Sequence, residues 1–201
     1  MAFLRTGFSG ETGPIVRGRG VWLRPYHMSD YGAWAELRAQ SRDHLAPWEP
    51  TWPRDELSRS SYRRRMRHYQ REMREDLGYA FVLLEDRSDR LLGGVTLSNV
   101  RRGVTQSASL GYWLGKSFTG RGYMSEAVGA VLAHAFASLR LHRVEAACMP
   151  DNTASIRVLE RNRFEREGYA RAYLHIAGGW RDHVLFARIS GQGPSGREEV
   201  R

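Results

Sequence analysis

The spacing of apolar residues along the chain alternates between a strand pattern and a helical pattern. Residues 15–24 alternate as a first strand, and helical spacing follows over about 29–42 and again over roughly 54–76. Between the two predicted helices, the segment 44–53 carries three prolines. Proline lacks a backbone N–H donor, so this segment is predicted to be an ordered loop without a regular helix.

A period of two, typical of strands, dominates the middle of the chain. Strands are predicted over 79–85 and 91–100, joined by a polar turn, and a third over 105–114. The remaining predicted elements, in chain order, are a helix over 124–139, a strand over 142–149, a helix over 152–162 and strands near 164–172 and 180–189. This order predicts a mixed α/β (α+β) domain in which helices flank a sheet.

Length and composition favour one domain, covering residues 15–189 of the 201 in the chain. We expect 1–14 to be a flexible N-terminus, and 190–201, rich in Gly, Ser and charged residues, to be a disordered tail. The single cysteine, Cys148, excludes an internal disulfide framework. No apolar run approaches the ~20 residues of a membrane span, so we predict a cytoplasmic protein with no membrane partner.

The chain is basic, with a net charge of +9 and a pI of about 10.3. Its arginines are densest over 63–74, within the second predicted helix. A basic surface attracts nucleic acid, acidic proteins or phosphorylated cofactors. The same cluster is also consistent with a solvated helix face that Glu72, Glu75 and Asp76 partly neutralise. Charge alone therefore does not select a function.

A glycine pair separates the strand over 105–114 from the helix over 124–139. Gly120-Arg121-Gly122 allows successive backbone N–H groups to point into one concavity, and the helix start adds unpaired N–H groups. Such a site binds phosphate or pyrophosphate, whereas the alternative is an ordinary strand-to-helix turn. No Lys-Ser/Thr follows, as in a P-loop, and the third glycine of a dinucleotide fingerprint is missing.

A second motif about thirty residues later gives the glycine pair its meaning. Asn152 and Ser155 open a helix that carries Leu159 and Glu160. Together with the loop over 119–124, this pattern resembles the coenzyme A site of the GNAT acetyltransferases. The resemblance implies a splayed, mostly antiparallel mixed sheet, acetyl-CoA as co-substrate, and no metal. The coenzyme-binding residues it implies are Tyr112, Trp113, Leu114, Thr119, Gly120, Arg121, Gly122, Tyr123, Met124, Asn152 and Ser155.

The N-terminal half resembles the RimJ/RimL branch of that family. The segments that resemble this branch are Leu23-Arg24-Pro25, Leu45-Ala46-Pro47-Trp48-Glu49-Pro50 and, near the end of the chain, Gly179-Trp180-Arg181-Asp182. The second of these segments is most similar to the RimJ type. Members of this branch acetylate the N-terminal α-amine of ribosomal proteins. The resemblance thus implies a protein N-terminus beginning with Ala or Ser as acceptor, and association with the ribosome.

The chain departs from the family where a proton donor is expected. Leu159 stands where many members have a tyrosine that protonates the departing thiolate, and Arg163 replaces a glycine after the same helix. Ser155, one turn earlier, is the nearest hydroxyl that can take over, or it is simply a serine at a helix start. The lone Cys148 on an apolar strand is typical of a core residue, so we expect direct attack by the amine without an acetyl-enzyme.

Acceptor-binding residues are expected near the proline-rich loop. Glu49 lies between two prolines and beside Trp48, a stiff and partly apolar setting for a catalytic carboxylate that faces the amine and can accept its proton, directly or through water; a solvated loop carboxylate is the alternative. Tyr173, Trp180 and Asp182 are candidates for the opposite wall; the alternatives are packing of Trp180 in the core and a turn hydrogen bond for Asp182. Two other functions stay open: acetylation of a small amine or antibiotic, and a non-catalytic role in ribosome assembly.

Overall fold

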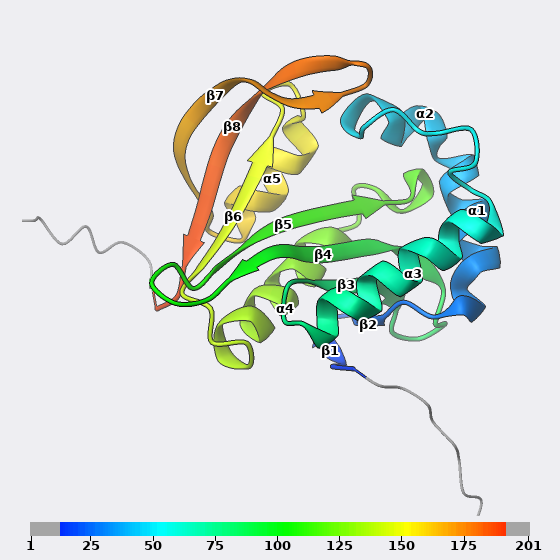
Figure 1. The fold of residues 1–201 in the computed structure, drawn as a ribbon, viewed down its shortest axis with the longest axis horizontal. Helices are drawn as coiled ribbons and strands as arrows, with labels where there is room; N and C mark the ends of the chain where they lie inside the picture. Colours follow the sequence, from blue (N-terminus) through cyan, green and yellow to red (C-terminus); the bar gives the residue numbers. More distant parts are fainter. Residues whose placement is uncertain (1–12, 192–201) are drawn as a thin grey trace, which may run out of the picture.

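The computed structural model describes residues 13–191, which form an eight-stranded sheet with helices on both faces (Figure 1). Most of the two predicted flexible ends, 1–14 and 190–201, lies outside the described residues. Within the described range, the N–H of Ser190 donates to the carbonyl of His142 at 2.8 Å, which fixes the end of the last strand. The α/β mixture predicted from the sequence is confirmed.

The sheet order is β1-β2-β3-β4-β5-β6-β8-β7, and neighbouring strands are antiparallel except for β5 and β6. The strands are β1 (Val16–Gly18), β2 (Val21–Pro25), β3 (Tyr79–Glu85), β4 (Leu91–Arg101), β5 (Ser107–Leu114), β6 (Arg143–Cys148), β7 (Glu165–Ile176) and β8 (Gly179–Ile189). The α-helices are α1 (Tyr31–Gln40), α2 (Arg42–Leu45), α3 (Arg59–Arg74), α4 (Tyr123–Ala137) and α5 (Thr153–Arg161). Short 3₁₀ helices are η1 (Met28–Asp30), η2 (Ala46–Trp48) and η3 (Lys116–Phe118).

Three predicted elements differ in the structure. The first strand is a hairpin of β1 and β2, because Gly20 adopts a φ of +74° and reverses the chain. The segment 44–53 is not free of helix: it contains the end of α2 and all of η2. Pro47 is tolerated there because it lies in the first turn of η2, where no N–H donor is required. The helix predicted from 54 begins at Arg59, capped by Ser58.

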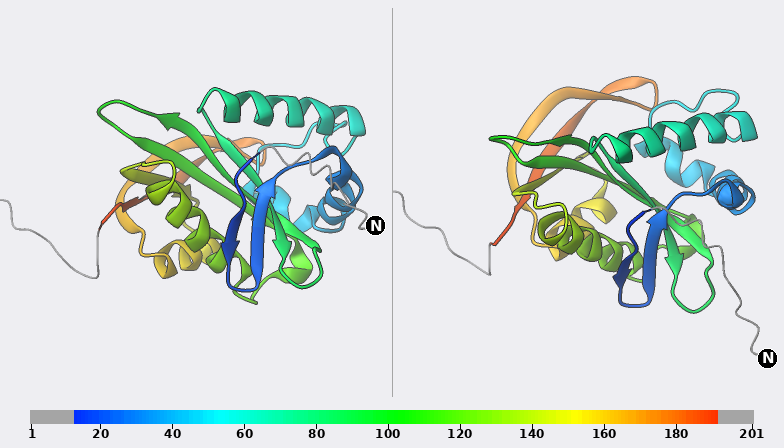
Figure 2. Two further views of the ribbon diagram at one scale, coloured as in Figure 1. Left: turned by 90° about the horizontal axis from the view of Figure 1, so that it is seen from below. Right: turned by 60° about the horizontal axis from the view of Figure 1, so that its bottom comes forward.

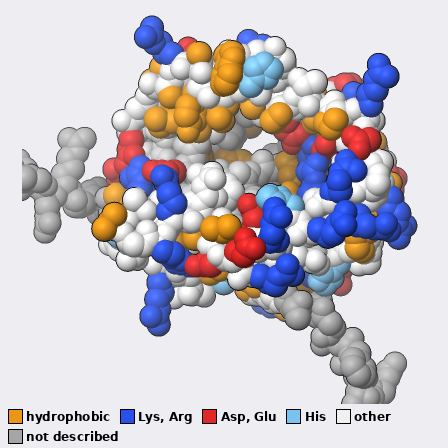
Figure 3. Space-filling model, viewed as in Figure 1, with side chains coloured by type: hydrophobic (Ala, Val, Ile, Leu, Met, Phe, Trp, Pro, Cys, Tyr) orange, Lys and Arg blue, Asp and Glu red, His pale blue; other side chains and the backbone are white. Residues whose placement is uncertain are grey.

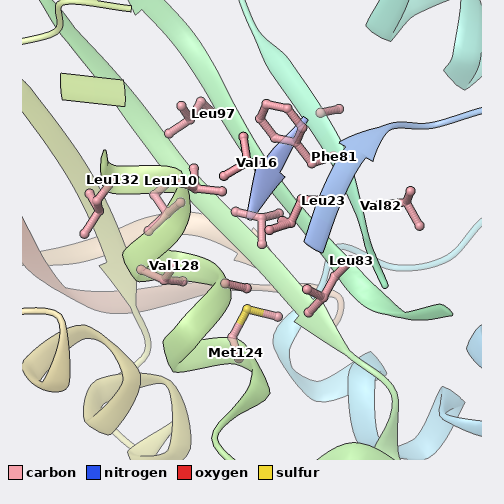
Figure 4. Packing of buried hydrophobic residues seen from close by; sticks show 14 of the residues in the cluster. Val16, Leu23, Phe81, Val82, Leu83, Leu97, Leu110, Met124, Val128 and Leu132 are labelled. Carbon is pink, nitrogen blue, oxygen red and sulfur yellow. The ribbon is translucent and has the colours of Figure 1, made fainter. Parts of the chain in front are cut away.

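The core lies between the sheet and α4. Met124, Val128 and Leu132 point from α4 towards the sheet and are buried there with Leu23 and Leu110 (Figure 4). Burying each such side chain contributes about 1.5–3 kcal/mol. Helix α3 covers the opposite face, so the sheet is the middle layer of three (Figure 2).

The sheet opens between β5 and β6. These parallel strands pair only where Ser107, Ala108 and Ser109 lie opposite Arg143, Val144 and Glu145. Beyond Ser109, β5 continues to Leu114 with β4 as its only strand partner among residues 13–191, and no other described strand pairs with its second backbone edge. The hairpin of β7 and β8 arches over this opening (Figure 1), and the N–H of Ala177 at its tip donates to the carbonyl of Glu49 at 3.0 Å.

Candidate active site

A cavity of about 680 Å³ fills the opening between β5 and β6. Its walls come from the end of β5, the loop before α4, the end of β6, the start of α5, the segment around η2, and β8. Figure 3 shows the molecule hollowed beneath the arch of the β7–β8 hairpin. One cavity thus joins the two motifs that the sequence analysis singled out.

The predicted phosphate loop has the required backbone. Gly120 and Gly122 have φ of +77° and +83°, and a Cβ atom at either would enter open space, so conformation rather than crowding selects glycine. The first intrahelical bond of α4 is from the N–H of Glu126 to the carbonyl of Gly122. The N–H groups of 123–125 precede it and have no helical partner, which leaves them available to an anion at the cavity wall.

Across the opening, a pair of hydroxyl groups connects β5 to α5. The Tyr112 and Ser155 hydroxyl oxygens are 2.7 Å apart, and Tyr112 also donates to the Ser155 carbonyl at 3.2 Å. Burial raises the pKa of Tyr112, so its phenol stays protonated. Asn152 caps α5, because its side-chain oxygen accepts the N–H of Ser155, while its amide NH₂ group has no partner among the described residues. Both predicted residues of α5 thus line the cavity.

Cys148 and Leu159 also line the cavity but offer little chemistry. Burial raises the pKa of the Cys148 thiol, which keeps it protonated and a weak nucleophile. Leu159 is almost fully buried and provides only an apolar surface. Leu159 has no hydroxyl group, and the Tyr112–Ser155 pair supplies two such groups to the same cavity.

Glu49 lies on the opposite wall and is fully engaged. Its two carboxylate oxygens accept from the Arg38 guanidinium at 3.2 and 2.6 Å, and the second also accepts from the Trp52 indole at 2.7 Å. Arg38 is only 4% exposed, and its guanidinium lies 4.5 Å from the centre of the Trp52 ring and 5.0 Å from that of Trp113. The rigidity expected from the prolines comes in large part from this ion pair.

A second cavity, of about 340 Å³, lies on the other side of Glu49. It shares Glu49 and Trp113 with the larger cavity and is otherwise lined mainly by aromatic rings, by Arg38 and by Glu56. Glu56 is bound to Arg65 at 2.6 Å and lies 3.7 Å from Arg38. Glu49 and Trp113 thus form the boundary between the two cavities.

The structure brings together most, but not all, of the predicted site residues. Those that line the larger cavity are Trp48, Glu49, Tyr112, Trp113, Leu114, Thr119, Gly120, Gly122, Tyr123, Met124, Asn152 and Ser155. Arg121 is exposed and does not line it. Tyr173 and Trp180 lie on the hairpin with exposed side chains, Trp180 at 66%, so packing of Trp180 in the core is excluded. Asp182 accepts from the Tyr169 hydroxyl and the Ala172 N–H, which lowers its pKa.

Several residues that line or support the cavity are not among the predicted site residues. His44 and His183 line the larger cavity and Arg38 holds Glu49, and neither Arg38 nor His183 belongs to a recognisable motif. The sequence predicts that His183 lies on a strand, next to Asp182. Only the tertiary structure shows that the His183 side of this strand borders the cavity. Among residues 13–191 there is no cluster of three or more His, Cys, Asp or Glu side chains that could hold a metal, and no helix long and apolar enough to span a membrane.

Most of the chain is similar to known acetyltransferases. Residues 21–165 match the model of the acetyltransferase (GNAT) domain family. A probable N-acetyltransferase of Bacillus subtilis, YjcK, is 36% identical over 176 residues, covering 88% of this chain and 97% of that protein. The [ribosomal protein uS5]-alanine N-acetyltransferase of Escherichia coli is 35% identical, covering 87% and 90%. The structure of Mycobacterium smegmatis RimJ in complex with CoA-disulfide superposes with a TM-score of 0.84 at 34% identity, covering 91% and 89%.

Proposed function

The chain belongs to the GNAT family of acetyl-CoA-dependent N-acetyltransferases, and from this premise we propose that its acceptor is the N-terminal α-amine of a protein, with Ala or Ser first. A ribosomal protein is the favoured acceptor, because relatives at 35% and 28% identity are named for acetylating ribosomal alanine and serine residues. An enzyme with such an acceptor would act in the cytoplasm. The larger cavity, which joins the glycine loop to Glu49, is the observation that supports this proposal.

The donor side of the cavity fits the coenzyme. We assign the pyrophosphate to the unpaired N–H groups that follow Gly120 and Gly122, and the pantetheine arm to the unpaired edge of β5 from Tyr112 to Leu114. The free amide NH₂ of Asn152 can donate to the same arm from α5. Thr119, Arg121, Tyr123 and Met124 complete the proposed loop. When bound, the coenzyme supplies an activated acetyl thioester.

The residues of the chain then provide electrostatic and proton-transfer help. Backbone N–H groups of β5 near Trp113 would stabilise negative charge on the thioester oxygen. Ser155, hydrogen-bonded to Tyr112, would donate the proton that the departing thiolate needs. The amine attacks directly in a ternary complex, since the Cys148 thiol is protonated and buried.

Glu49 is proposed as the carboxylate that attracts the acceptor. Its charge, held at the boundary of the two cavities, would favour the ammonium form on arrival. An α-amine with a pKa near 7.7–8.0 loses its proton at far smaller cost than a lysine side chain near 10.4, which favours an N-terminal acceptor. Trp48, which also lines the larger cavity, would select small first residues. Tyr173, Trp180 and Asp182 remain predicted contacts for later residues of the peptide.

The test is a library of synthetic peptides that vary at the first residue, incubated with acetyl-CoA and analysed by mass spectrometry. We expect acetylation at the α-amine of peptides beginning with Ala or Ser, and none on internal lysines. The same peptides with a blocked N-terminus serve as the control. Acetylation of polyamines or aminoglycosides, with none of the peptides modified, would contradict the proposed acceptor; no turnover of acetyl-CoA with any amine would favour a non-catalytic role.

Association with the ribosome is proposed on the basis of α3. The exposed Arg63, Arg67 and Arg74 lie on one face of the helix, and Figure 3 shows basic side chains gathered over it. Asp76 binds Arg102 and Glu72 contacts His68, so neither is paired with these three arginines. Elsewhere in the cluster, Arg64 and Arg65 are paired with Asp55 and Glu56. Replacing the three arginines by Glu should weaken binding to ribosomal subunits and leave acetylation of free peptides unchanged. Equal sedimentation of the variant and the parent with ribosomes would contradict this.

A further inference from the structure

We propose that His183 is the base that accepts the proton of the attacking amine. This inference rests on the acetyl transfer assigned above but not on the identity of the acceptor amine. His183 lies on β8, is 4% exposed, and lines the larger cavity together with Glu49, Trp113 and Ser155. A buried imidazole beside a reaction cavity is well suited to general base catalysis, because neutral and protonated imidazole are both accessible near neutral pH.

The hydrogen bonding of His183 fixes which nitrogen is free. Nδ1 lies 2.9 Å from the carbonyl oxygen of Arg181. A carbonyl oxygen only accepts, so Nδ1 carries the hydrogen, and in the neutral ring Nε2 has an unprotonated lone pair. No described residue hydrogen-bonds Nε2, and Nε2 is not among the buried polar atoms that lack a partner, which indicates that it borders open space. The ring therefore presents a base to the cavity.

The sheet register places this base at the reacting end of the opening. Val184 pairs with Cys148, the last residue of β6, so His183 lies one step beyond the point where β6 ends. The Tyr173 ring packs edge-on against the imidazole with 5.8 Å between ring centres, which restrains its orientation. The N–H of Ala177, on the same hairpin, bonds the carbonyl of Glu49. This bond joins the β7–β8 hairpin, which carries His183, to the loop that carries Glu49.

Glu49, the alternative proton acceptor, is poorly suited to that step. Both of its oxygens already accept hydrogen bonds from Arg38, and one accepts a further bond from Trp52. Taking up a proton would break a buried, bidentate ion pair. Asp151, the remaining carboxylate on the cavity wall, is exposed at the start of α5. A division of labour follows, in which Glu49 attracts the ammonium ion and His183 removes a proton.

In the proposed step, a nitrogen–carbon bond forms between the amine and the acetyl carbon, and the carbon–sulfur bond of the thioester breaks. The proton leaves the amine nitrogen for Nε2 of His183, and the thiolate receives a proton from Ser155. Proton exchange with solvent then restores the neutral imidazole and the Ser155 hydroxyl, so that in sum one proton moves from the amine to the thiol. The titratable and charged groups on the surrounding elements are Arg181 and Asp182 on β8, Tyr169, Arg171 and Tyr173 on β7, Cys148 on β6, and His44 and Glu49 across the cavity.

The test compares His183→Gln and His183→Asn with the parent enzyme, using its best aliphatic amine acceptor. We expect kcat/KM at pH 7 to fall by about 10²-fold or more, as is usual for loss of a general base. The affinity for coenzyme A, measured by calorimetry, and the far-UV circular dichroism spectrum should be unchanged. The acidic limb of the pH–rate profile that reports protonation of the imidazole should disappear. His175→Gln is the matched control, because His175 is exposed on β7 and does not line the cavity.

A second acceptor separates a base from a structural residue. An aromatic amine is already neutral at pH 7, and its nitrogen gives up a proton more readily after attack, so it depends less on a base. The loss of kcat/KM in the His183 variants should therefore be at least tenfold smaller with this acceptor. Equal losses with aliphatic and aromatic amines, or parental activity in both variants, would overturn the proposal. A parent that ignores peptides but acetylates another amine would contradict only the proposed acceptor, since the His183 comparison proceeds with that amine.

Discussion

Replacing Glu49 by Gln tests the acceptor side of the cavity while keeping the shape of the side chain. Glu49 is 22% exposed and satisfies Arg38, which is 4% exposed. Breaking a buried ion pair costs about 3–5 kcal/mol. The Gln oxygen can still accept one of the bonds, and a hydrogen bond to a charged group is worth about 1.5–3 kcal/mol. We therefore expect a net destabilisation of about 1.5–2 kcal/mol, which lowers Tm by about 3–8 °C in a domain of this size.

The functional effect should exceed this loss of stability. At a temperature where the variant is fully folded, kcat/KM for peptides should fall at least tenfold at pH 7, and the affinity for acetyl-CoA should not change. The deficit should shrink as the pH rises, because neutral amine becomes abundant and attraction of the ammonium ion matters less. Melting curves, calorimetry with acetyl-CoA and steady-state kinetics between pH 6.5 and 9 measure the three quantities separately.

Glu56→Gln is the matched control. Glu56 is 11% exposed and also lies beside Arg38, at 3.7 Å, but it borders only the smaller cavity. Its replacement should destabilise the fold through the lost bond to Arg65 and spare the activity of the folded enzyme. If Glu49→Gln acetylates peptides at the parental rate, or if both variants lose activity in proportion to stability, Glu49 is a structural partner of Arg38 and the acceptor binds elsewhere.

The remaining predictions concern the donor side. Gly122→Pro should weaken coenzyme A binding more than tenfold by calorimetry, because proline does not adopt the φ of +83° found there; unchanged affinity in a folded variant would exclude this loop as the phosphate site. Cys148→Ala should remain active, and the thiol should react with iodoacetamide only slowly at pH 7 and faster as the pH rises, because burial raises its pKa; a trapped acetyl-enzyme with ping-pong kinetics would contradict direct attack. Ser155→Ala should lower kcat by about 10²-fold with little effect on KM, and Tyr112→Phe should have a smaller effect; a larger loss in Tyr112→Phe would assign proton donation to the phenol.

The sequence alone determined most of the secondary structure and the residues proposed for the donor side of the cavity. Period-two and helical spacing are local properties, so the strands from β3 to β8 and helices α4 and α5 were predicted within a few residues. Gly120 and Gly122 could be interpreted because a backbone with positive φ selects glycine wherever it occurs. Errors arose where local rules allow two outcomes, as in the β1–β2 hairpin and in the helical turns around Pro47.

Only the tertiary structure decided which side chains face the cavity and which residues contact one another across it. Glu49 looked like an isolated loop carboxylate, because its partner Arg38 comes from α1 and the pairing depends on how that helix packs over the proline-rich segment. Tyr173 and Trp180 were expected on the wall of the site, but their side chains are exposed and do not line the larger cavity, whereas His183 on the same hairpin does. Contacts between segments far apart in sequence depend on the packing of the whole sheet, which no local pattern records. The opening between β5 and β6 is such a property, because it exists only where two strands part.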